Sequence, residues 1–469
     1  MQYRQIFPAI QKTLQELLHK YPTIGSIVAD IVKDGGSALL VGGAVRDLLL
    51  AKPVKDSDIE VHGVPLERLD VIMQKYGSVS LVGKSFGVLR LHGLDVDWAL
   101  PRVDAAGRKP TVVLDPYMSI AVACKRRDLT INAMAIDLTT FVLYDPYNGQ
   151  RDLHDGILRP TDMQLFLEDP LRFFRVMQFI GRFAMVPSAE LNQLCRTMDI
   201  SGVSVERIEQ EFSKMLLKSV YPAAGIRWIE HIGRLNDVLP ELAATRAIPQ
   251  NPAWHPEGDV FEHTMQAVDA AAIIAQSYES EYNKLLLLYA ALCHDLGKVT
   301  TTHVIDGTIK SELHPQAGAV IARQMLKRIT HTHDLIHTVY LLVQYHMEPG
   351  QFVRGGAKVP AYKLLARKLA PYTTLSMLAD LALADVRGRN PKGSEPLMLE
   401  SEDVRAFRTC AQRARVLECV EQSVLQGRDL LDLVPPGPRL GQLVRRAYEI
   451  QIEEGITNVD ELKRRVLAE

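Results

Sequence analysis

The stretch SALLVGGAVRDLLLAKPVKDSDIEVHG, residues 37–63, decides the fold. It opens with an apolar run typical of a buried strand, passes through Gly42 and Gly43 into a helix-like segment, and ends in a second strand that carries Asp56 and Asp58. Paired glycines let the backbone approach a ligand, and a helix that starts after them favours phosphate. Since residues two apart in a strand face the same side, Asp56 and Asp58 predict paired carboxylates that suit two divalent metals.

The order and spacing of these features carry more information than either feature alone. A lone pair of glycines is usually a turn, and a lone DxD is usually surface. Together, GGAVRDLLL followed by KDSDIEV resembles the signature of the nucleotidyltransferase superfamily, in the branch that contains the class II tRNA nucleotidyltransferases and bacterial poly(A) polymerases. One departure is the segment IEVHG, which stands where an IAT-type sequence is more usual.

The composition limits the class of protein. A chain of 469 residues is too long for one compact core and predicts two to four domains. With 54 Lys and Arg against 56 Asp and Glu, the chain has no overall basic field, so RNA binding would need local patches. Five scattered cysteines without CxxC spacing indicate reduced thiols in a cytoplasmic protein. No run of 18 apolar residues occurs, so we expect no membrane segment.

Strand and helix patterns predict a multidomain α+β protein: a small α/β head, then helices to the end of the chain. Proline-rich stretches interrupt the helical part. The expected parts are an N-terminal helical segment (1–35), the head (36–155), a helical neck (156–250), a further helical domain (251–400) and a helical tail (401–469). By the resemblance, the head is a polymerase beta-like nucleotidyltransferase domain, and the neck reads bases and binds RNA.

A third carboxylate usually completes a two-metal site of this kind. The segment LDVDWALPR offers Asp95 and Asp97, and the resemblance falls on Asp97, with Asp95 as the second choice. Alternating aspartates are also typical of the solvent-exposed face of a strand. On the helix after the glycines, Arg46 is a candidate to hold phosphate or to pin the aspartates, and structural ion-pairing is the alternative.

The segment CKRRDLTINAMAID, residues 124–137, predicts a binding site for a triphosphate and a ribose. Arg126 and Arg127 point to opposite sides of the backbone, Asp128 can accept a hydrogen bond from a ribose hydroxyl, and Asn132 falls one helical turn beyond Asp128. A basic cluster is more often a solvated face. RRDLTINA nevertheless resembles the second motif of the same family almost letter for letter.

The segment EDPLRFFRVMQFIGRFA, residues 168–184, is predicted as a helix with Asp169, Arg172 and Arg175 along one stripe. Cytosine and adenine share an amino donor beside a ring-nitrogen acceptor, so a carboxylate and an arginine would select them. The resemblance implies this template role for Asp169 and Arg172. The alternative is a surface ion pair three residues apart.

A second constellation follows in the further helical domain. Histidine and aspartate dispersed over helices can assemble a metal site, although a single helical histidine is more often structural. His263, the adjacent pair His294-Asp295 in LCHDLGK, and Asp385 form a pattern that resembles the HD phosphohydrolase superfamily over residues 250–400. The resemblance implies His263, His294, Asp295 and Asp385 as primary ligands, with His294 and Asp295 catalytic.

In the same domain, His314 and His346 suit a second metal or a substrate phosphate. The expected cofactor there is a divalent transition metal such as Ni, Mn or Co, or Mg²⁺, which would activate water for attack on a phosphoester. The implied substrates are RNA-end 2′,3′-cyclic phosphates or 2′-phosphates.

A local basic stretch is the predicted source of RNA affinity. Residues 349–379 contain no acidic side chain and five basic ones: Arg354, Lys358, Lys363, Arg367 and Lys368. Such a stretch can follow a phosphate backbone. A solvated helix face is the alternative reading.

These patterns lead to one hypothesis: a tRNA nucleotidyltransferase that adds or repairs the 3′-terminal CCA from CTP and ATP, fused to an HD phosphohydrolase. Asp56, Asp58 and Asp97 would hold Mg²⁺. The alternatives are a poly(A) polymerase of the same branch, an enzyme that adds only CC or only A, and a catalytically decayed RNA-binding protein. The segment 102–115 is shorter than the flexible loop of the family and is the expected place for such a restriction. We expect tRNA as the partner and a monomer or homodimer.

Overall fold

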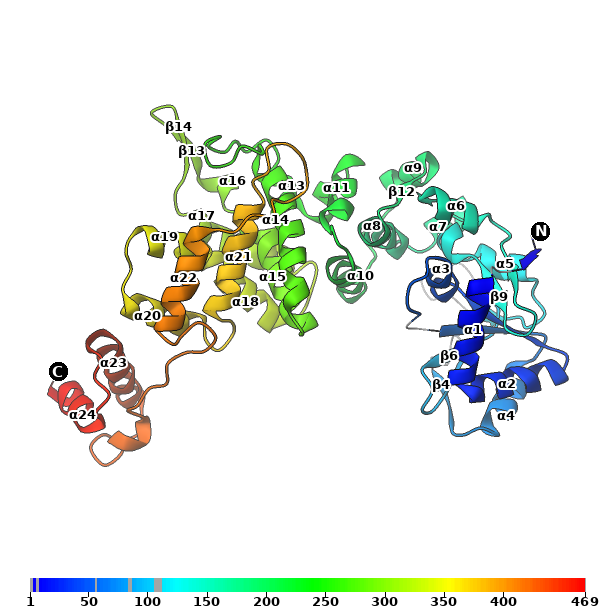
Figure 1. Cartoon of the computed structure of the whole chain (residues 1–469), viewed down its shortest axis with the longest axis horizontal. Helices are drawn as coiled ribbons and strands as arrows, with labels where there is room; N and C mark the ends of the chain where they lie inside the picture. The colour runs from blue at the N-terminus through cyan, green and yellow to red at the C-terminus, as the bar shows by residue number, and fades with distance from the viewer. Residues whose placement is uncertain (1–2, 6–7, 55–56, 83–86, 105–111, 469) are drawn as a thin grey trace. The chain divides into compact units, whose positions relative to one another are not determined.

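The computed structural model describes residues 3–5, 8–54, 57–82, 87–104 and 112–468. The chain divides into two compact units, Met1–Val203 and Ser204–Glu469 (Figure 1). The region 156–250, expected as one neck, is thereby shared between the two units. The α+β fold class is confirmed.

An eight-stranded sheet of order β1-β10-β9-β2-β3-β6-β5-β4 forms the centre of the first unit. Only β3 and β6 run parallel; the other neighbouring pairs described in this sheet are antiparallel. The strands are β1 (Tyr3–Gln5), β2 (Ser37–Val41), β3 (Ser57–His62), β4 (Val79–Val82), β5 (Val88–Leu91), β6 (Val96–Ala99), β9 (Ala135–Asp137) and β10 (Val142–Tyr144). The shorter pairs are β7 (Arg102–Asp104) with β8 (Val112–Leu114), and β11 (Ile157–Leu158) with β12 (Val186–Pro187).

The two faces of this sheet have different characters. Leu40, Ile59 and Trp98 belong to the large apolar core, which they share with α1 (Pro8–Lys20), α2 (Pro22–Lys33) and α4 (Leu66–Gln74). Because side chains alternate along a strand, Asp58 and Glu60 lie on the opposite face from Ile59. That opposite face is therefore the one available for chemistry.

The remaining helices of the first unit are short, apart from α8. They are α3 (Gly43–Leu49), α5 (Ile120–Lys125), α6 (Gly149–Asp155), α7 (Met163–Leu167), α8 (Leu171–Phe183) and α9 (Ala189–Thr197). The expectation of helix throughout residues 1–35 is wrong at its start, because β1 pairs with β10 at the sheet edge. β9, which lies inside the RRDLTINAMAID segment, was not predicted either.

The second unit is a helical assembly in which α14, α15, α18 and α21 lie together (Figure 1). Its helices are α10 (Val205–Lys218), α11 (Ala223–His231), α12 (Leu235–Val238), α13 (Pro240–Ala243), α14 (Val260–Ile274), α15 (Glu281–Cys293), α16 (Lys298–Thr301), α17 (His314–Leu326), α18 (His333–Tyr345), α19 (Glu348–Arg354), α20 (Val359–Leu369), α21 (Leu375–Arg387), α22 (Glu402–Arg413), α23 (Pro438–Glu454) and α24 (Val459–Ala468). Towards the C-terminus, α23 and α24 pack around a small core of their own.

The prediction of a purely helical region after the head is wrong at two places: the short β11–β12 pair lies after residue 155, and a hairpin lies further along the chain. β13 (Thr302–Ile305) and β14 (Thr308–Ser311) form an antiparallel hairpin between α16 and α17. Among the described helices, none combines the length and apolarity needed to cross a membrane.

Candidate active sites

In the head, the sheet register brings two predicted carboxylates side by side. Asp58 on β3 is the direct partner of Asp97 on the parallel strand β6, and neighbouring strands are about 4.8 Å apart. Asp97 accepts a 2.7 Å hydrogen bond from Nε of Arg90, its neighbour on β5. Asp95 is exposed and precedes β6, so the geometry favours Asp97. Asp56 lies outside the described residues.

Gly42 packs directly against an arginine of the second motif. Its φ is +71°, and a Cβ atom at this position would lie 2.5 Å from Nη1 of Arg127. The positive φ favours glycine, and a Cβ would displace the Arg127 guanidinium from its present position. Gly43 then begins α3. The glycine pair and the RRD motif therefore form one surface, although they are far apart in the sequence.

The IEVHG departure contains a buried carboxylate that organises this surface. Glu60 lies 3.1 Å from Nε2 of His62, 3.6 Å from Nη2 of Arg126 and 3.8 Å from Nη2 of Arg127. Burial opposes ionisation, but the His62 hydrogen bond and the two guanidinium groups outweigh it and lower the pKa of Glu60 to about 2. The role of Glu60 was not predicted; the signal was its alternation with Asp58 along the strand.

Arg46 is held inside the first unit. Its Nε and Nη2 atoms donate to Oδ1 of Asp47 at 2.9 and 2.7 Å, and Nη1 donates to Oδ1 of Asn132 at 2.6 Å. The guanidinium also lies 4.6 Å from the ring centre of Phe183. With these nitrogens engaged, the geometry favours structural ion-pairing over a phosphate contact.

The RRD motif is a turn rather than part of a helix. α5 ends at Lys125, and a short 3₁₀ helix covers Thr130–Asn132, so the expected helical turn between Asp128 and Asn132 is wrong. Their side chains nevertheless meet, because Nδ2 of Asn132 donates to Oδ1 of Asp128 at 2.9 Å. Oδ2 of the buried Asp128 accepts from Nε of Arg175 at 2.6 Å.

The predicted base-reading stripe is anchored to this motif. α8 begins at Leu171, so Asp169 precedes the helix, and its Oδ1 accepts from the backbone N–H of Leu171 at 3.1 Å. Arg172 donates to the carbonyl oxygen of Arg126 at 2.6 Å and to that of Leu165 at 2.7 Å. The structure thus brings the stripe and the RRD turn together.

In the second unit, four dispersed residues converge on one point. His263 comes from α14, His294 and Asp295 follow α15, and Asp385 lies near the end of α21. Nε2 of His263 is 3.1 Å from Nε2 of His294, 3.1 Å from Oδ1 of Asp385 and 3.5 Å from Oδ2 of Asp295. All four side chains are buried.

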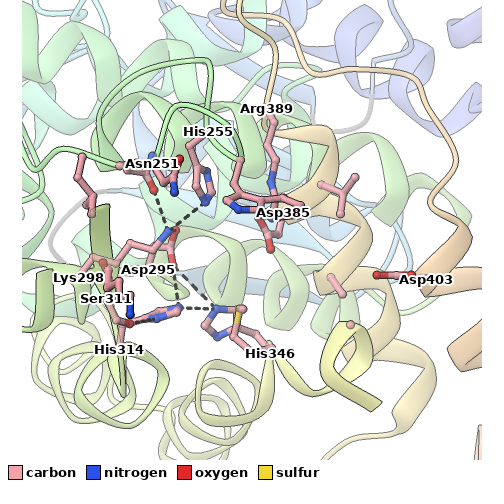
Figure 2. A pocket seen from close by; sticks show the side chains of 18 of the residues that line it. Asn251, His255, Asp295, Lys298, Ser311, His314, His346, Asp385, Arg389 and Asp403 are labelled. Carbon is pink, nitrogen blue, oxygen red and sulfur yellow. Dashed lines mark hydrogen bonds and ion pairs between the residues drawn. The ribbon is translucent and has the colours of Figure 1, made fainter. Parts of the chain in front are cut away.

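A second group shares Asp295 with the first. Its other oxygen, Oδ1, is 3.4 Å from Nε2 of His314 and 3.9 Å from Nε2 of His346 (Figure 2). Nε2 of His314 lies 3.2 Å from Nε2 of His346. Asp295 thus belongs to two clusters of three ligand-type side chains, His263–His294–Asp295 and Asp295–His314–His346. A carboxylate in this position can bridge two metal ions.

The donor set fits divalent metals. Each histidine directs Nδ1 at a backbone carbonyl: His263 at Gly388 (3.1 Å), His294 at Ala291 (2.8 Å), His314 at Ser311 (2.7 Å) and His346 at Val343 (2.7 Å). A proton on Nδ1 leaves an Nε2 lone pair, so these lone pairs converge with the carboxylates. Lone pairs that face one another at such distances repel unless a proton or a metal ion lies between them, and imidazole nitrogen and carboxylate oxygen bind divalent metals.

The pKa shifts of two of these histidines are consistent with a metal site. Burial, together with the neighbouring His314 and His294, lowers the pKa of His346 to about 3, so it is a neutral imidazole. Burial disfavours charge on His263 too, but hydrogen bonds to Asp385 and Glu257 outweigh it and raise the pKa of His263 to about 9. The position beside His263 therefore favours a cation.

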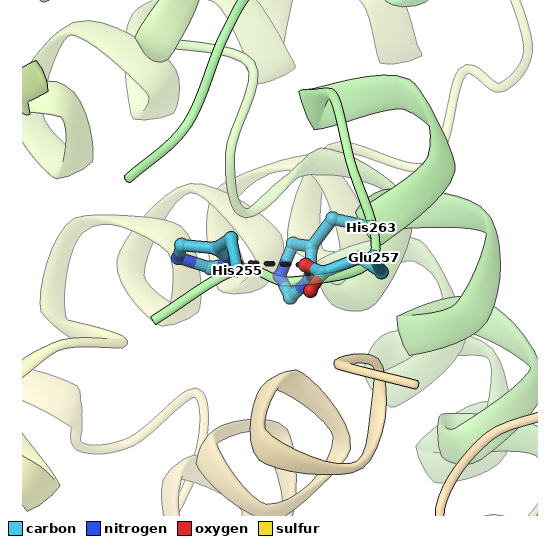
Figure 3. A group of neighbouring side chains, drawn as sticks. All are labelled: His255, Glu257 and His263. Carbon is cyan, nitrogen blue, oxygen red and sulfur yellow. Dashed lines mark hydrogen bonds and ion pairs between the residues drawn. The ribbon is translucent and has the colours of Figure 1, made fainter. Parts of the chain in front are cut away.

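Three neighbours of this centre were not predicted. Nζ of Lys298 donates to Oδ2 of Asp295 at 2.7 Å. Oε1 of Glu257 lies 2.7 Å from Nδ1 of His263 and 2.9 Å from Nδ1 of His255 (Figure 3). The segment WHPEG, interpreted only as a proline-rich interruption, held the signal in a histidine and a glutamate two residues apart.

Comparisons with known proteins agree with both centres. The poly A polymerase head domain model matches residues 38–159, and the HD domain model matches residues 260–384. The multifunctional CCA protein of Halorhodospira halophila is 31% identical over 423 residues, covering 87% of this chain and 94% of that protein. The chain belongs to the multifunctional CCA protein family. The predicted class II tRNA nucleotidyltransferase fused to an HD domain is confirmed.

Another member of the family and several solved structures are similar to this chain. The relative from Pasteurella multocida is 35% identical over 318 residues, covering 66% of this chain and 73% of that protein. A CCA-adding enzyme solved in complex with CTP has a TM-score of 0.64 at 19% identity, covering 100% of this chain and 99% of that one. The Bacillus stearothermophilus CCA-adding enzyme, also with CTP, has a TM-score of 0.62 at 17% identity, with 98% of each chain covered. These structures share the fold.

Proposed function

We propose that the head completes or repairs the 3′-terminal CCA of tRNA from CTP and ATP. The observation that carries the proposal is the parallel register that sets Asp58 beside Asp97. Asp56, Asp58 and Asp97 would hold Mg²⁺, which would activate the RNA 3′-hydroxyl and stabilise the triphosphate. That hydroxyl loses its proton to water, its oxygen bonds to the α-phosphorus, the bond from the α-phosphorus to the bridging oxygen of the β-phosphate breaks, and pyrophosphate leaves. Related proteins solved with tRNA, CTP and ATP support these substrates.

The side chains around the two aspartates would bind the nucleotide. Arg126 and Arg127, held by Glu60, would neutralise the triphosphate beside Gly42. Asp128 and Asn132 would orient the turn that receives the ribose, and Gly43 and Arg46 would support it.

The selection of C and A over U and G would rest on the stripe at the start of α8. Asp169 and Arg172 would read the base edge, and Arg175 would hold Asp128 in place.

The test compares variants of the two proposed metal ligands with a variant of Asp95, which lies two residues before Asp97. Asp58→Ala and Asp97→Ala should abolish incorporation of CMP and AMP, whereas the exposed Asp95→Ala is the matched control and should retain it. The substrates are transcripts that end before CCA, before CA and before A, with labelled CTP and ATP supplied separately. Incorporation by the Asp97→Ala variant would overturn the site. Addition of only CC, only A or long A runs would identify the corresponding alternative, and absence of any addition would indicate a decayed RNA-binding protein.

We propose that the second unit is a phosphohydrolase that removes 2′,3′-cyclic phosphate or 2′-phosphate from RNA ends. His263, His294, Asp295 and Asp385 would hold one divalent metal, such as Mn, Ni, Co or Mg. Asp295, which both groups share, would hold a second metal or receive the phosphate together with His314 and His346. A metal bound there would lower the pKa of water and polarise the phosphoester.

Lys298 would orient the shared carboxylate of this centre, because its Nζ donates a hydrogen bond to Asp295. With a 2′-phosphate, a water oxygen bonds to phosphorus, the phosphorus–O2′ bond breaks, a proton passes to O2′, and inorganic phosphate leaves. With a 2′,3′-cyclic phosphate, water first breaks the phosphorus–O3′ bond and a proton passes to O3′, which leaves a 2′-phosphate for the same hydrolysis. The His294→Ala variant should lose the hydrolase activity and keep nucleotide addition. Loss of both activities would contradict the assignment of separate centres.

A further inference from the structure

Two phenylalanines of α8 form an aromatic surface beneath an arginine of α3. The rings of Phe179 and Phe183 are stacked, with their centres 5.8 Å apart and an angle of 27° between their planes. The guanidinium carbon of Arg46 lies 4.6 Å from the centre of the Phe183 ring and 5.4 Å from that of Phe179. An aromatic face attracts a guanidinium, and the attraction is stronger where water is excluded. Because Arg46 and Phe179 are both buried, this contact fastens α3 to α8.

The same arginine begins a chain of hydrogen bonds that runs through the RRD motif. Nη1 of Arg46 donates to Oδ1 of Asn132 at 2.6 Å, and Nδ2 of Asn132 donates to Oδ1 of Asp128 at 2.9 Å. The other carboxylate oxygen of Asp128 accepts from Nε of Arg175 at 2.6 Å, which brings the chain back to α8. Hydrogen bonds in a buried chain depend on one another. A displacement of either end would therefore move the groups between.

An aromatic contact closes this chain into a ring. The guanidinium carbon of Arg175 lies 5.3 Å from the centre of the Phe179 ring, which also contacts Arg46. Phe179 follows Arg175 by four residues on α8, so the two side chains lie on the same face of the helix. Both arginines thus meet at Phe179. We call the closed set the contact ring, and its members are Arg46, Asn132, Asp128, Arg175 and Phe179.

The contact ring joins the two parts of the candidate nucleotide site. Asp128 and Asn132 belong to the turn that would receive the ribose, whereas the start of α8 would read the base. Arg172, near the start of α8, also donates to the carbonyl oxygen of Arg126 at 2.6 Å. The helix is therefore attached to the turn at two places, by this hydrogen bond and by the contact ring. Together the two attachments fix the distance between the base-reading side chains and the turn.

We propose that Phe179 is a positioning residue for base selection: it closes the contact ring and holds α8 where cytosine and adenine fit but uracil and guanine do not. This role rests on the proposed addition of C and A by the head, and it names a residue that sets the accuracy of that addition. Phe179 is buried and would not touch the nucleotide. Its effect would pass through Arg46 and Arg175 to the turn.

The accuracy of nucleotide addition tests this role, on the full chain with a transcript that ends before CCA. Phe179→Leu keeps a large apolar side chain and removes the aromatic face that both arginines contact. We expect kcat/KM for CTP to fall about 10-fold, which corresponds to roughly 1.4 kcal/mol. UTP does not fit the base-reading geometry, so its kcat/KM should change little, and the CTP-to-UTP ratio should fall about 10-fold. Inhibition by inorganic triphosphate, which carries no base, should be unchanged.

The matched control is Lys52→Met. It removes an exposed cation that lies 4.6 Å from the centre of the Phe183 ring and leaves the contact ring intact, so the CTP-to-UTP ratio should not change. Phe183→Leu, at a half-buried position, removes the other aromatic contact of Arg46 and should lower the ratio in the same direction as Phe179→Leu. Thermal melting checks the fold of each variant.

A double variant tests whether the contacts act as one ring. Asn132→Ala opens the contact ring at a different link from Phe179→Leu. Effects at independent sites add in free energy, so their fold-changes multiply. A ring that is already open loses little when it is opened again. The double variant should therefore lower the CTP-to-UTP ratio no further than the stronger of the two single variants.

Three results would overturn the positioning role: equal losses for CTP and UTP in Phe179→Leu, an unchanged ratio, or a double variant whose loss equals the product of the single losses. Equal losses would show that Phe179 only stabilises the fold. The two proposals fail separately. An unmodified chain that adds no CMP contradicts the proposed function, and the ratio of the Kd values for CTP and UTP, measured without RNA, then tests Phe179→Leu. A chain that adds CMP with a ratio unaffected by Phe179→Leu contradicts only the positioning role.

Discussion

Oε1 of Glu257 lies 2.7 Å from Nδ1 of His263, and neither side chain is exposed. The second oxygen of Glu257 is buried and has no hydrogen-bond partner among the described residues. A buried carboxylate with one unmatched oxygen is costly, and here it fixes the proton of His263 on Nδ1. Nε2 of His263 therefore faces the candidate metal ligands, an arrangement in which a carboxylate orients a metal-binding histidine.

We expect Glu257→Ala to weaken Mn²⁺ binding at the HD centre about 10- to 100-fold, as is typical when the outer partner of a metal-binding histidine is removed. Glu257→Gln keeps a hydrogen-bond acceptor and should lose less. Competition against a fluorescent chelator measures the affinity directly, without an activity assay. The exposed Glu279→Ala is the control, and thermal melting checks the fold. Equal Mn²⁺ affinities of Glu257→Ala and the unmodified chain would show that Glu257 does not position His263.

The contact between Arg175 and Asp128 makes a prediction for stability. Asp128 is buried, and although burial disfavours its charge, Arg175 and Asn132 lower its pKa. Arg175→Met would leave this charge without its cation, and we expect a loss of about 3 kcal/mol. Asp128→Asn combined with Arg175→Met should recover most of that loss. Urea unfolding and hydrogen exchange of the α8 amides measure the change, and Arg151→Met, at an exposed side chain of α6, is the control. A double variant as unstable as the single one would exclude an uncompensated charge as the cause.

The sequence predicts elements with strong local patterns and is silent on contacts between distant segments. The strands of residues 37–63 were predicted because apolar runs, glycines and alternating carboxylates lie in one short stretch. The β13–β14 hairpin also had a local signal that was missed: Asp306-Gly307 between β-branched residues. Both residues have positive φ, as a two-residue hairpin turn requires.

In the candidate sites too, the sequence indicates residues with a local pattern but not the contacts between distant segments. The resemblance to the HD superfamily implied His263, His294 and Asp295, and the adjacent pair His294-Asp295 is the chemically distinctive local part of that pattern. The contact of Arg175 with Asp128 joins residues 47 positions apart, and no periodicity encodes such a distance. Arg46 was ambiguous for the same reason, since its partner Asn132 is 86 residues away.

Glu60 should matter for nucleotide binding through the two arginines that it holds. Glu60→Gln removes the charge beside Arg126 and Arg127, so we expect KM for CTP and ATP to rise about 10-fold, the effect of roughly 1.4 kcal/mol, with a smaller change in kcat. Because the pKa of Glu60 is lowered to about 2, its contribution is present above that range and is lost only as the pH falls towards 2. The ratio of the two enzymes should thus be constant from pH 5 to 9. Glu67→Gln, exposed at the start of α4, is the control. A ratio that changes within this range, or an unchanged KM, would contradict the role.

Asp269, on α14, should make the stability of the second unit depend on pH. Its Oδ1 accepts from the N–H of Ala223 at 2.8 Å. Burial raises the pKa of Asp269 to about 7, although this hydrogen bond and Arg227 oppose the shift. The folded state therefore holds the proton more tightly than the unfolded chain, whose aspartate pKa is about 3.9. Stability from this group is fully present below about pH 4 and falls as the pH rises towards 7.

Asp269→Asn keeps an acceptor for Ala223 and removes the charge, so its stability relative to the unmodified chain should increase with pH. Each pKa unit corresponds to about 1.4 kcal/mol, and about two units separate pH 5 from the pKa of Asp269, so we expect an increase of about 3 kcal/mol between pH 5 and pH 8. Urea unfolding at both pH values, with chelator throughout, gives the difference, and the exposed Asp334→Asn supplies the baseline. If the relative stability of Asp269→Asn is the same at pH 5 and pH 8, Asp269 is already ionised in the folded protein at pH 5. The N–H of Ala223 and the charge of Arg227 would then outweigh burial at this site.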